Sequence, residues 1–432
     1  MAATTTFGPR REERHAHSEN RATPGFLERL SETVGGALLG VGLLAVSFYV
    51  LFTNEGRAQR TAASLDEALS QVVLLHPPFV PELQTNNQLV HLSAPLRTTQ
   101  PLFDPNYQVA VAAVKLRREV EMYQWVEYQD SRDYQEDGET RSETTYTYNT
   151  EWRSEVINSR NFDKEIGHLN PSAMAVESVT VVAPEVWVGG FSLSKGLLEK
   201  INNFQRLSLG SFPAAASDPF LTVHEDYFYH ATNPRRPEVT VACVFACVCM
   251  RSFSSSHALF HGQVGDVRVS FSYAGLSGEG SYPGPAQVVT VVAMQRDNQL
   301  VSFRSTSGEQ IEILYLEELS AQEVFEKEHR MNSMKTWALR AAGWALMFLG
   351  ISLATRIVYT LVDWLPVVRD VVNVGLKLFA LCVSSSLALL TIAAGWIFYR
   401  PLVAGALGAL ALVPFLVTRS RSRSHSPPKK HE

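Results

Sequence analysis

The residues best suited to metal chemistry lie in two short segments. His224 and Glu225 are followed by His230, and three of the four cysteines fall within 243–249. A zinc-binding helix places its histidines four residues apart, whereas these two are six apart in a strand-like run, too far to bind one ion together. The cysteines have no second group of ligands at zinc spacing. We therefore expect no metal site and no cofactor.

Motifs for nucleophilic catalysis or phosphate binding are incomplete. The segment 275–279 lacks the second glycine of a nucleophile elbow, and Gly189-Gly190 precedes Lys195 at the wrong spacing for a phosphate-binding loop. Carboxylates are frequent at 127–139, where they alternate with polar residues as on a solvated sheet face or a protected edge. The sequence therefore favours a protein that is not an enzyme and has no catalytic residues.

Long apolar segments lie at both ends of a chain whose average resembles that of a soluble protein. The 432 residues have a formal charge of -5, and 46% are hydrophobic. The runs 34–52, 376–398 and 401–418 match a bilayer core of about 30 Å at about 1.5 Å per residue. The two C-terminal runs must turn sharply at 399–401. The length of the first run favours an uncleaved anchor over a signal peptide.

A further span is predicted at 337–358, although Arg340 and Arg356 interrupt it. Long arginine side chains can reach the headgroups from either end. Basic residues precede the first span in 1–33, lie between the second and third spans at Arg356, Arg369 and Lys377, and follow the fourth span in 419–432, whereas the third connection has only Arg400. This pattern places the segments 1–33, 359–375 and 419–432 on the cytoplasmic or nucleoplasmic side. Both termini are then cytoplasmic or nucleoplasmic, and 53–334 lies outside the cytosol.

The long segment 53–334 has mainly strand character. The runs 110–128 and 139–152 flank Asp137-Gly138, a typical hairpin dipeptide. Other strand-like runs are 176–191, 219–229, 267–273, 287–295 and 299–304. Helices are expected at 194–204 and after the capping patterns Ser64–Glu67 and Ser320–Glu323. The expected class is an α+β membrane protein with four transmembrane helices, one N-terminal and three C-terminal, enclosing a β-rich lumenal domain.

Small residues at spacings of four recur in two spans, where they allow close helix approach or simply face lipid. They are Gly36 with Gly40, Ala404 with Gly408, and Gly405 with Ala409. Ser384–Ser386, in the middle of the 376–398 span, can hydrogen bond to its own helix or to a neighbour. A channel or lipid-handling protein built on the C-terminal three-helix unit is therefore the alternative function.

The C-terminal tail contains two indications of location. Arginine and serine alternate at 419–424. This pattern fits either a basic segment that follows a membrane span, or a segment that binds acidic surfaces and is switched by phosphorylation. Lys429 and Lys430 occupy the positions of a di-lysine retrieval signal of endoplasmic-reticulum membrane proteins. Since segment 53–334 contains no Asn-x-Ser/Thr sequon, an internal lumen fits better than the cell surface.

Several long strings resemble the transmembrane protein 43 (LUMA) family of the inner nuclear membrane and endoplasmic reticulum. They are Pro24–Thr33 (PGFLERLSET), Phe52–Arg57 (FTNEGR), Val120–Val126 (VEMYQWV), Tyr148–Glu155 (YNTEWRSE), Asn170–Ser178 (NPSAMAVES), Ser270–Gly278 (SFSYAGLSG) and Ser333–Trp337 (SMKTW). The resemblance implies four spans, a large lumenal loop, self-association, and a non-enzymatic scaffold or adaptor that organises inner-nuclear-membrane complexes. It also implies emerin, lamins and SUN-domain proteins as partners, besides the lipid bilayer, and no nucleic acid.

One segment, 239–263, departs from the family pattern and includes all three clustered cysteines. It begins with valine, whose codons start with GT, and ends with glutamine, whose codons are CAA or CAG. These are the bases expected at the donor and acceptor ends of an intron. We interpret it as a retained intron or gene-model error; if it is real, it is too short to span a membrane.

Overall fold

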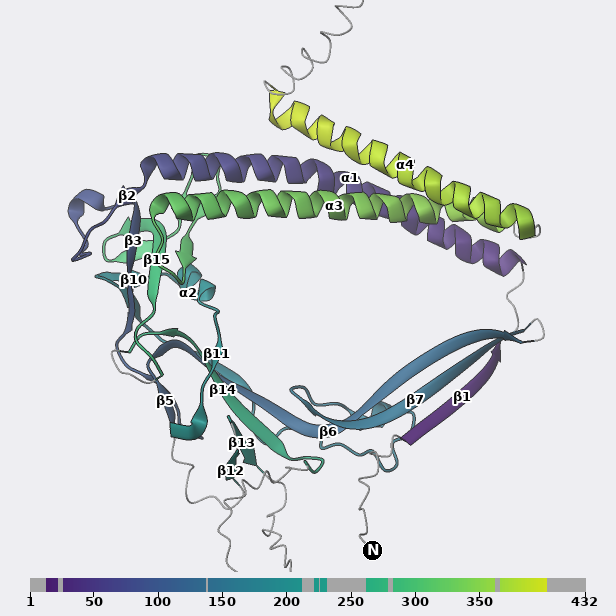
Figure 1. Ribbon diagram of the computed structural model, residues 1–432, viewed down its shortest axis with the longest axis horizontal. Coiled ribbons are helices and arrows are strands. Elements are labelled where there is room, and N and C mark those ends of the chain that lie inside the picture. Colours follow the sequence, from purple (N-terminus) through teal and green to yellow (C-terminus); the bar gives the residue numbers. More distant parts are fainter. Residues whose placement is uncertain are drawn as a thin grey trace, which may run out of the picture. The chain divides into compact units, whose positions relative to one another are not determined.

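The computed structural model describes residues 13–21, 26–136, 139–211, 221–224, 226–230, 262–278, 283–361 and 366–401. Two compact units form (Figure 1). The β unit comprises residues up to Thr23, Leu75–Val301 and Glu312–Glu318. The helical unit comprises Pro24–Leu74, Ser302–Ile311 and the residues from Leu319 onward.

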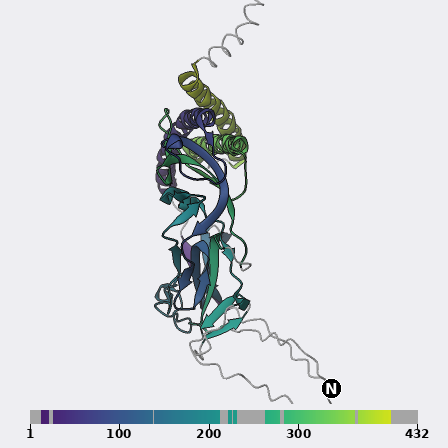
Figure 2. The ribbon, with the colours of Figure 1, turned by 90° about the vertical axis from the view of Figure 1, so that its left-hand side faces the viewer.

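Three long helices make up most of the helical unit, and they lie together in the turned view (Figure 2). They are α1 (Phe26–Gln71), α3 (Ala321–Leu361) and α4 (Pro366–Tyr399). Stretches within them, Val34–Gln71, Ala321–Arg356 and Val374–Tyr399, are long and apolar enough to cross a membrane. The α+β class and three of the expected membrane helices are confirmed. The fourth, 401–418, lies outside the described residues apart from Pro401.

Helix α1 continues far past its apolar part, so the expected helix start at Ser64 is wrong. No proline occurs between 53 and 71 to end the helix. The Ser64 hydroxyl donates to the Arg60 carbonyl one turn earlier and contacts Ser307. The Glu67 carboxylate accepts from the backbone N–H and hydroxyl of Thr306. These contacts hold the loop between β17 (Phe303–Arg304) and β18 (Gln310–Ile311) against α1.

The capping box expected at the start of α3 is confirmed. The Ser320 N–H donates to the Glu323 carboxylate at 2.8 Å, and the Glu323 N–H donates to the Ser320 hydroxyl at 3.3 Å. Two backbone donors at the helix start are thereby satisfied by this reciprocal pair. The Ser320 N–H and hydroxyl both donate to the Glu323 carboxylate and lower its pKa.

The apolar contacts of the helical unit join all three helices. Its core contains Leu51 of α1, Met347 and Ile351 of α3, and Ala380 and Ala388 of α4. Helices α1 and α3 are antiparallel, because Gly40 meets Gly350 near one end and Asp66 meets His329 near the other. A Cβ added at Gly40 would lie 2.6 Å from the Gly350 carbonyl oxygen, so only glycine permits this approach.

Two sheets form the β unit. The first has the order β1 (Glu13–Arg21), β7 (Glu139–Arg153), β6 (Ala113–Glu136), β14 (Val267–Leu276), β13 (Tyr227–His230) and β12 (Leu221–His224). In it, β8 (Val179–Val182) pairs with β6, and β11 (Gln205–Arg206) pairs with β14. The second has the order β19 (Ile313–Tyr315), β15 (Val288–Arg296), β16 (Gln299–Val301), β10 (Phe191–Leu193), β9 (Val186–Val188), β3 (Leu89–Thr98) and the short β2 (Val73–Leu74), and β15 also pairs with β3.

Smaller elements connect these strands. They are β2 (Val73–Leu74), β4 (Leu102–Asp104), β5 (Val109–Val111), helix α2 (Lys195–Lys200) and the 3-10 turns Leu83–Thr85, Ser159–Asn161 and Leu209–Ser211. Helix α2, which begins after the N-cap Ser194, confirms the helix expected near 194–204. The core of the unit includes β14 and β15, which are buried along most of their length.

The long hairpin predicted around Asp137-Gly138 is confirmed by its register. The β6–β7 ladder runs from Met122↔Arg153 to Glu136↔Glu139, which leaves two residues for the connection. Two other predicted runs are subdivided. Run 219–229 contains β12 and the start of β13, which pair with each other. Run 176–191 contains β8, β9 and the first residue of β10, because Gly189, with φ 61°, reverses the chain.

Strand β1 pairs antiparallel with β7, from Glu13↔Tyr148 to Arg21↔Thr140. The sequence places residues 1–33 and 53–334 on opposite sides of a membrane. A ladder requires both strands on one side, so β1–β7 pairing within one chain and a full crossing by 34–52 exclude each other.

Candidate functional site

A buried ion pair lies where the apolar part of α1 ends. Glu55, 5% exposed, accepts from Arg340 of α3 through both carboxylate oxygens, at 2.7 and 2.8 Å. The Trp396 indole of α4 donates to the same carboxylate at 2.9 Å. The three helices therefore meet at one carboxylate, and bidentate guanidinium pairing is the strongest geometry for such a contact.

Aromatic rings and a glycine position this pair. The Arg340 guanidinium carbon lies 4.8 Å from the Trp337 ring centroid and 5.9 Å from that of Trp396. A Cβ at Gly395 would approach the Glu55 side chain to 3.0 Å, so α4 comes close because residue 395 has no side chain. A charge in such an apolar setting is tolerated only with a partner, and here each charge has one.

A second set of polar contacts joins α1 and α3 next to the ion pair. The Arg57 guanidinium donates to the side-chain oxygens of Asn332 at 3.2 Å, Asn54 at 3.1 Å and Thr336 at 3.3 Å. Asn54 donates to the Thr336 carbonyl, and Asn332 donates to the Ala58 carbonyl. We call residues Asn54, Glu55, Arg57, Asn332, Thr336, Arg340 and Trp396 the polar cluster.

A cavity of about 240 Å³ adjoins the polar cluster. Glu55, Asn332, Thr336 and Arg340 border it, and Arg400 is also on its wall. The Arg57 Nε is buried and has no hydrogen-bond partner. Buried polar groups of this kind are commonly satisfied by water, for which such a volume has room. Glu55 accepts three hydrogen bonds from two residues, so the cluster links α1 to both α3 and α4.

The predicted helix-packing residues have different surroundings. Gly40 meets the Gly350 backbone, whereas a Cβ at Gly36 would have no atom within 4 Å. Ala404, Gly405, Gly408 and Ala409 lie outside the described part of the chain, as do Lys429 and Lys430 of the expected retrieval signal.

The serines considered for a pore are occupied by local hydrogen bonds. Ser384 and Ser385 donate to the Leu381 carbonyl, and Ser386 donates to the Cys382 carbonyl. The Trp344 indole also donates to the Ser385 hydroxyl at 3.1 Å. These serines therefore support α4 and its contact with α3.

No group of three or more histidine, cysteine or acidic residues with the geometry of a metal site occurs among the residues the structure describes. His224 and His230 lie at opposite ends of the β12–β13 pair, opposite Tyr227 and Leu221. Residues 231–261, with the clustered cysteines, are outside the described ranges.

Two tyrosines of the β unit have raised pKa values with structural causes. Burial raises the pKa of Tyr107 to about 12, although Arg118 opposes the shift. The pKa of Tyr148 is raised by burial and by its 2.7 Å hydrogen bond to Glu127. His168 stacks on the Tyr148 ring with centroids 4.0 Å apart. Both phenols therefore remain neutral donors at neutral pH, as packed structural residues do.

Sequence reasoning missed the polar cluster. Arg340 was interpreted as reaching headgroups, whereas it pairs with Glu55, 285 residues away along the chain. An arginine within an apolar stretch requires a counter-ion, and Glu55 is the first charged residue after the uncharged stretch of the first span. That pairing rule was the available signal, although the choice of partner requires the helix register.

Comparisons with known proteins agree on one family. A family model described as Transmembrane protein 43 matches residues 122–401. Proteins named Transmembrane protein 43 from Mus musculus and Homo sapiens are each 53% identical over 425 residues, which cover 98% of this chain and 98% of each relative. A Drosophila melanogaster protein named Transmembrane protein 43 homolog is 34% identical over 402 residues, covering 90% of this chain and 96% of its own. No solved structure matches.

Proposed function

Because the chain belongs to the transmembrane protein 43 family, we propose that it is a non-enzymatic membrane scaffold of the endoplasmic reticulum and nuclear envelope. Its β unit lies on the lumenal or perinuclear side and its termini in the cytoplasm or nucleoplasm. Self-association and contacts with emerin, lamins and SUN-domain proteins belong to this proposal. The membrane helices hold the protein in place, and the β unit binds the partners that lie in the lumen.

The long β6–β7 ribbon is the observation that carries this proposal. Strand β6 pairs with β14 only from Ala113 to Met122, and beyond Met122 it pairs with β7 (Figure 1). Residues 128–132 of this outer part are exposed. Without β1, this outer part would be a two-stranded ribbon, and isolated two-stranded ribbons are marginally stable in water, so it favours added contacts.

The outer edge of β7 supports binding by strand addition. It accepts a nine-residue antiparallel strand, β1, opposite residues 140–148. If 34–52 crosses the membrane, β1 cannot reach this edge from within the same chain, and the edge is left for another strand. An exposed edge provides a row of backbone donors and acceptors for that purpose. We therefore assign the β7 edge to a lumenal strand of a partner protein.

Proximity labelling from the lumenal side tests the proposal. A labelling enzyme inserted after Asp297, in the tight turn between β15 and β16, is expected to recover nuclear-envelope and endoplasmic-reticulum proteins. Recovery of neither group would contradict a scaffold role there.

A shortened ribbon provides the matched variant. Replacing 130–145 by Asn-Gly joins the paired residues Gln129 and Tyr146 and leaves the β14-paired part of β6 intact. We expect this variant to keep its membrane location and lose the lumenal partners. If it keeps them all, the ribbon is not the docking surface.

A further inference from the structure

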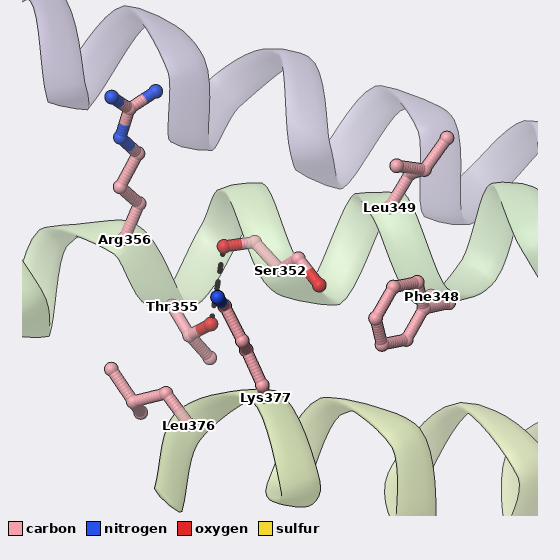
Figure 3. Close-up of a pocket in the computed structure, with 7 residues that line it drawn as sticks. All are labelled: Phe348, Leu349, Ser352, Thr355, Arg356, Leu376 and Lys377. Atoms are coloured by element: carbon pink, nitrogen blue, oxygen red, sulfur yellow. Dashed lines mark hydrogen bonds between the residues drawn. The ribbon is translucent and has the colours of Figure 1, made fainter. Parts of the chain in front are cut away.

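A second cavity lies between α3 and α4, at the end of the helical unit opposite the polar cluster. Its volume is about 400 Å³. Lys377 of α4 and the hydroxyl residues Ser352 and Thr355 of α3 border it, together with Phe348 and Leu349 (Figure 3). The wall thus combines a cation, hydroxyls and apolar side chains.

The polar side of this cavity suits an anion. Figure 3 shows the Lys377 ammonium at the hydrogen bond between the Thr355 hydroxyl and the Ser352 carbonyl, while the Ser352 hydroxyl points toward Phe348 and Arg356 points away from Lys377. None of the lining residues that the structure describes is acidic. The Ser352 hydroxyl oxygen is buried without a hydrogen-bond partner, whereas the Thr355 hydroxyl donates to the carbonyls of Ile351 and Ser352. The cation of Lys377 is therefore the group on this wall that suits an anion.

The position of the cavity along the helices suits a lipid. Arg356 and Lys377 end the uncharged stretches of α3 and α4 on the same side of the helix pair, so both belong at a membrane boundary. Phe348 and Leu349 lie one to two turns deeper in α3, at acyl-chain depth. A free phosphate would leave this apolar wall without a partner, whereas a lipid would cover it.

We propose that this cavity binds one anionic phospholipid of the cytoplasmic leaflet. Its phosphate contacts the Lys377 ammonium, and one acyl chain lies along Phe348 and Leu349. This site goes beyond the scaffold proposal and does not depend on the β unit or its partners.

Native mass spectrometry tests the site. The full-length protein is extracted from phosphatidylcholine vesicles that contain 10 mol% phosphatidylserine, and the lipids that it retains are identified. We expect one phosphatidylserine to be retained per chain. A cation near an anionic membrane contributes about 1 kcal/mol, so Lys377→Gln should weaken retention by roughly fivefold. Ser352→Leu fills the cavity without changing charge and should also reduce retention. Lys377→Arg should retain the lipid.

Lys335→Gln is the matched control, because Lys335 is an exposed cation of α3 far from this cavity. The proposal is overturned if Lys377→Gln and Ser352→Leu retain phosphatidylserine as the unaltered protein does, or if phosphatidylcholine is retained equally. Displacement of the lipid by millimolar inorganic phosphate would also overturn it, since the site would then be one for a free anion.

Discussion

Glu55→Gln removes the charge at the centre of the polar cluster while keeping the side chain's shape. The Arg340 guanidinium then stays buried with no counter-charge, since its other close neighbours are the rings of Trp337 and Trp396. Breaking a buried ion pair by removing one partner costs about 3–5 kcal/mol. Hydrogen bonds between membrane helices contribute about 0.6 kcal/mol on average. A loss above about 2 kcal/mol would therefore report the uncompensated charge and not the missing hydrogen bonds.

The free energy of unfolding can be measured by titrating the full-length protein in mixed detergent micelles with sodium dodecyl sulfate, while helix content is followed by circular dichroism. Glu326→Gln is the matched control on α3. Glu326 and Arg330 form an exposed pair at 3.3 Å with side chains 68% and 72% exposed, so its loss should cost no more than about 0.5 kcal/mol. Glu55→Gln should shift the transition by several times that amount.

A double variant identifies the cause. Replacing Glu55 and Arg340 together by leucine removes both charges, and apolar replacements of buried pairs are often neutral or stabilising. We expect the double variant to be more stable than Glu55→Gln alone. If Glu55→Gln unfolds at the same detergent fraction as Glu326→Gln, the ion pair does not stabilise the helical unit and the reasoning is refuted.

The remaining predictions concern helix packing, a helix start and membrane sidedness. Gly40→Val should cost about 1–3 kcal/mol in the same titration because its side chain would collide with Gly350, whereas Gly36→Val, which meets no atom within 4 Å, should be nearly neutral. Ser320→Ala should lower the free energy of unfolding at pH 7, because it removes the N-cap hydroxyl. The Ser320 hydroxyl contributes to the lowered pKa of Glu323, so this part of its contribution is complete above the ordinary glutamate pKa and is lost as the pH falls through the lowered value; the Ser320→Ala difference should therefore shrink on acidification. A tag placed before Glu13 should be digested by protease added outside sealed microsomes; a protected tag would instead support β1–β7 pairing within one chain.

Helices and strands that are defined by local sequence patterns could be predicted from the sequence. The three described membrane helices were predictable because the apolar runs 34–52, 337–358 and 376–398 are long enough to span a bilayer, although two arginines interrupt the second run. Asp137-Gly138 predicted the β6–β7 hairpin because few dipeptides accept its turn. The Ser320–Glu323 box marked the start of α3 because the preceding residues are not helical. The same pattern at Ser64 failed, since a helix already in progress needs a breaker to stop, and none is present.

Features set by distant residues could not be predicted in this way. Glu55 has several arginines as possible partners, and only the α1–α3 register selects Arg340. The lipid cavity depends on how Ser352 and Lys377 face each other across α3 and α4. Strand order in the β unit is equally non-local, because β14 lies between β6 and β13 although more than 100 residues separate it from β6.

The register of α1 and α3 explains why so polar a cluster occurs at this depth. Apolar membrane helices can slide past one another, because one row of leucines and alanines packs much like the next and lipid competes equally for both. Polar pairs are different, since each donor must meet its own acceptor. Glu55 with Arg340 and Arg57 with Asn332 hold the middle of the helix pair, and Asp66 with His329 continues the same antiparallel order beyond it. A slip of one turn would separate all three pairs and also move Gly40 away from Gly350. The cluster therefore selects a single register for both helices.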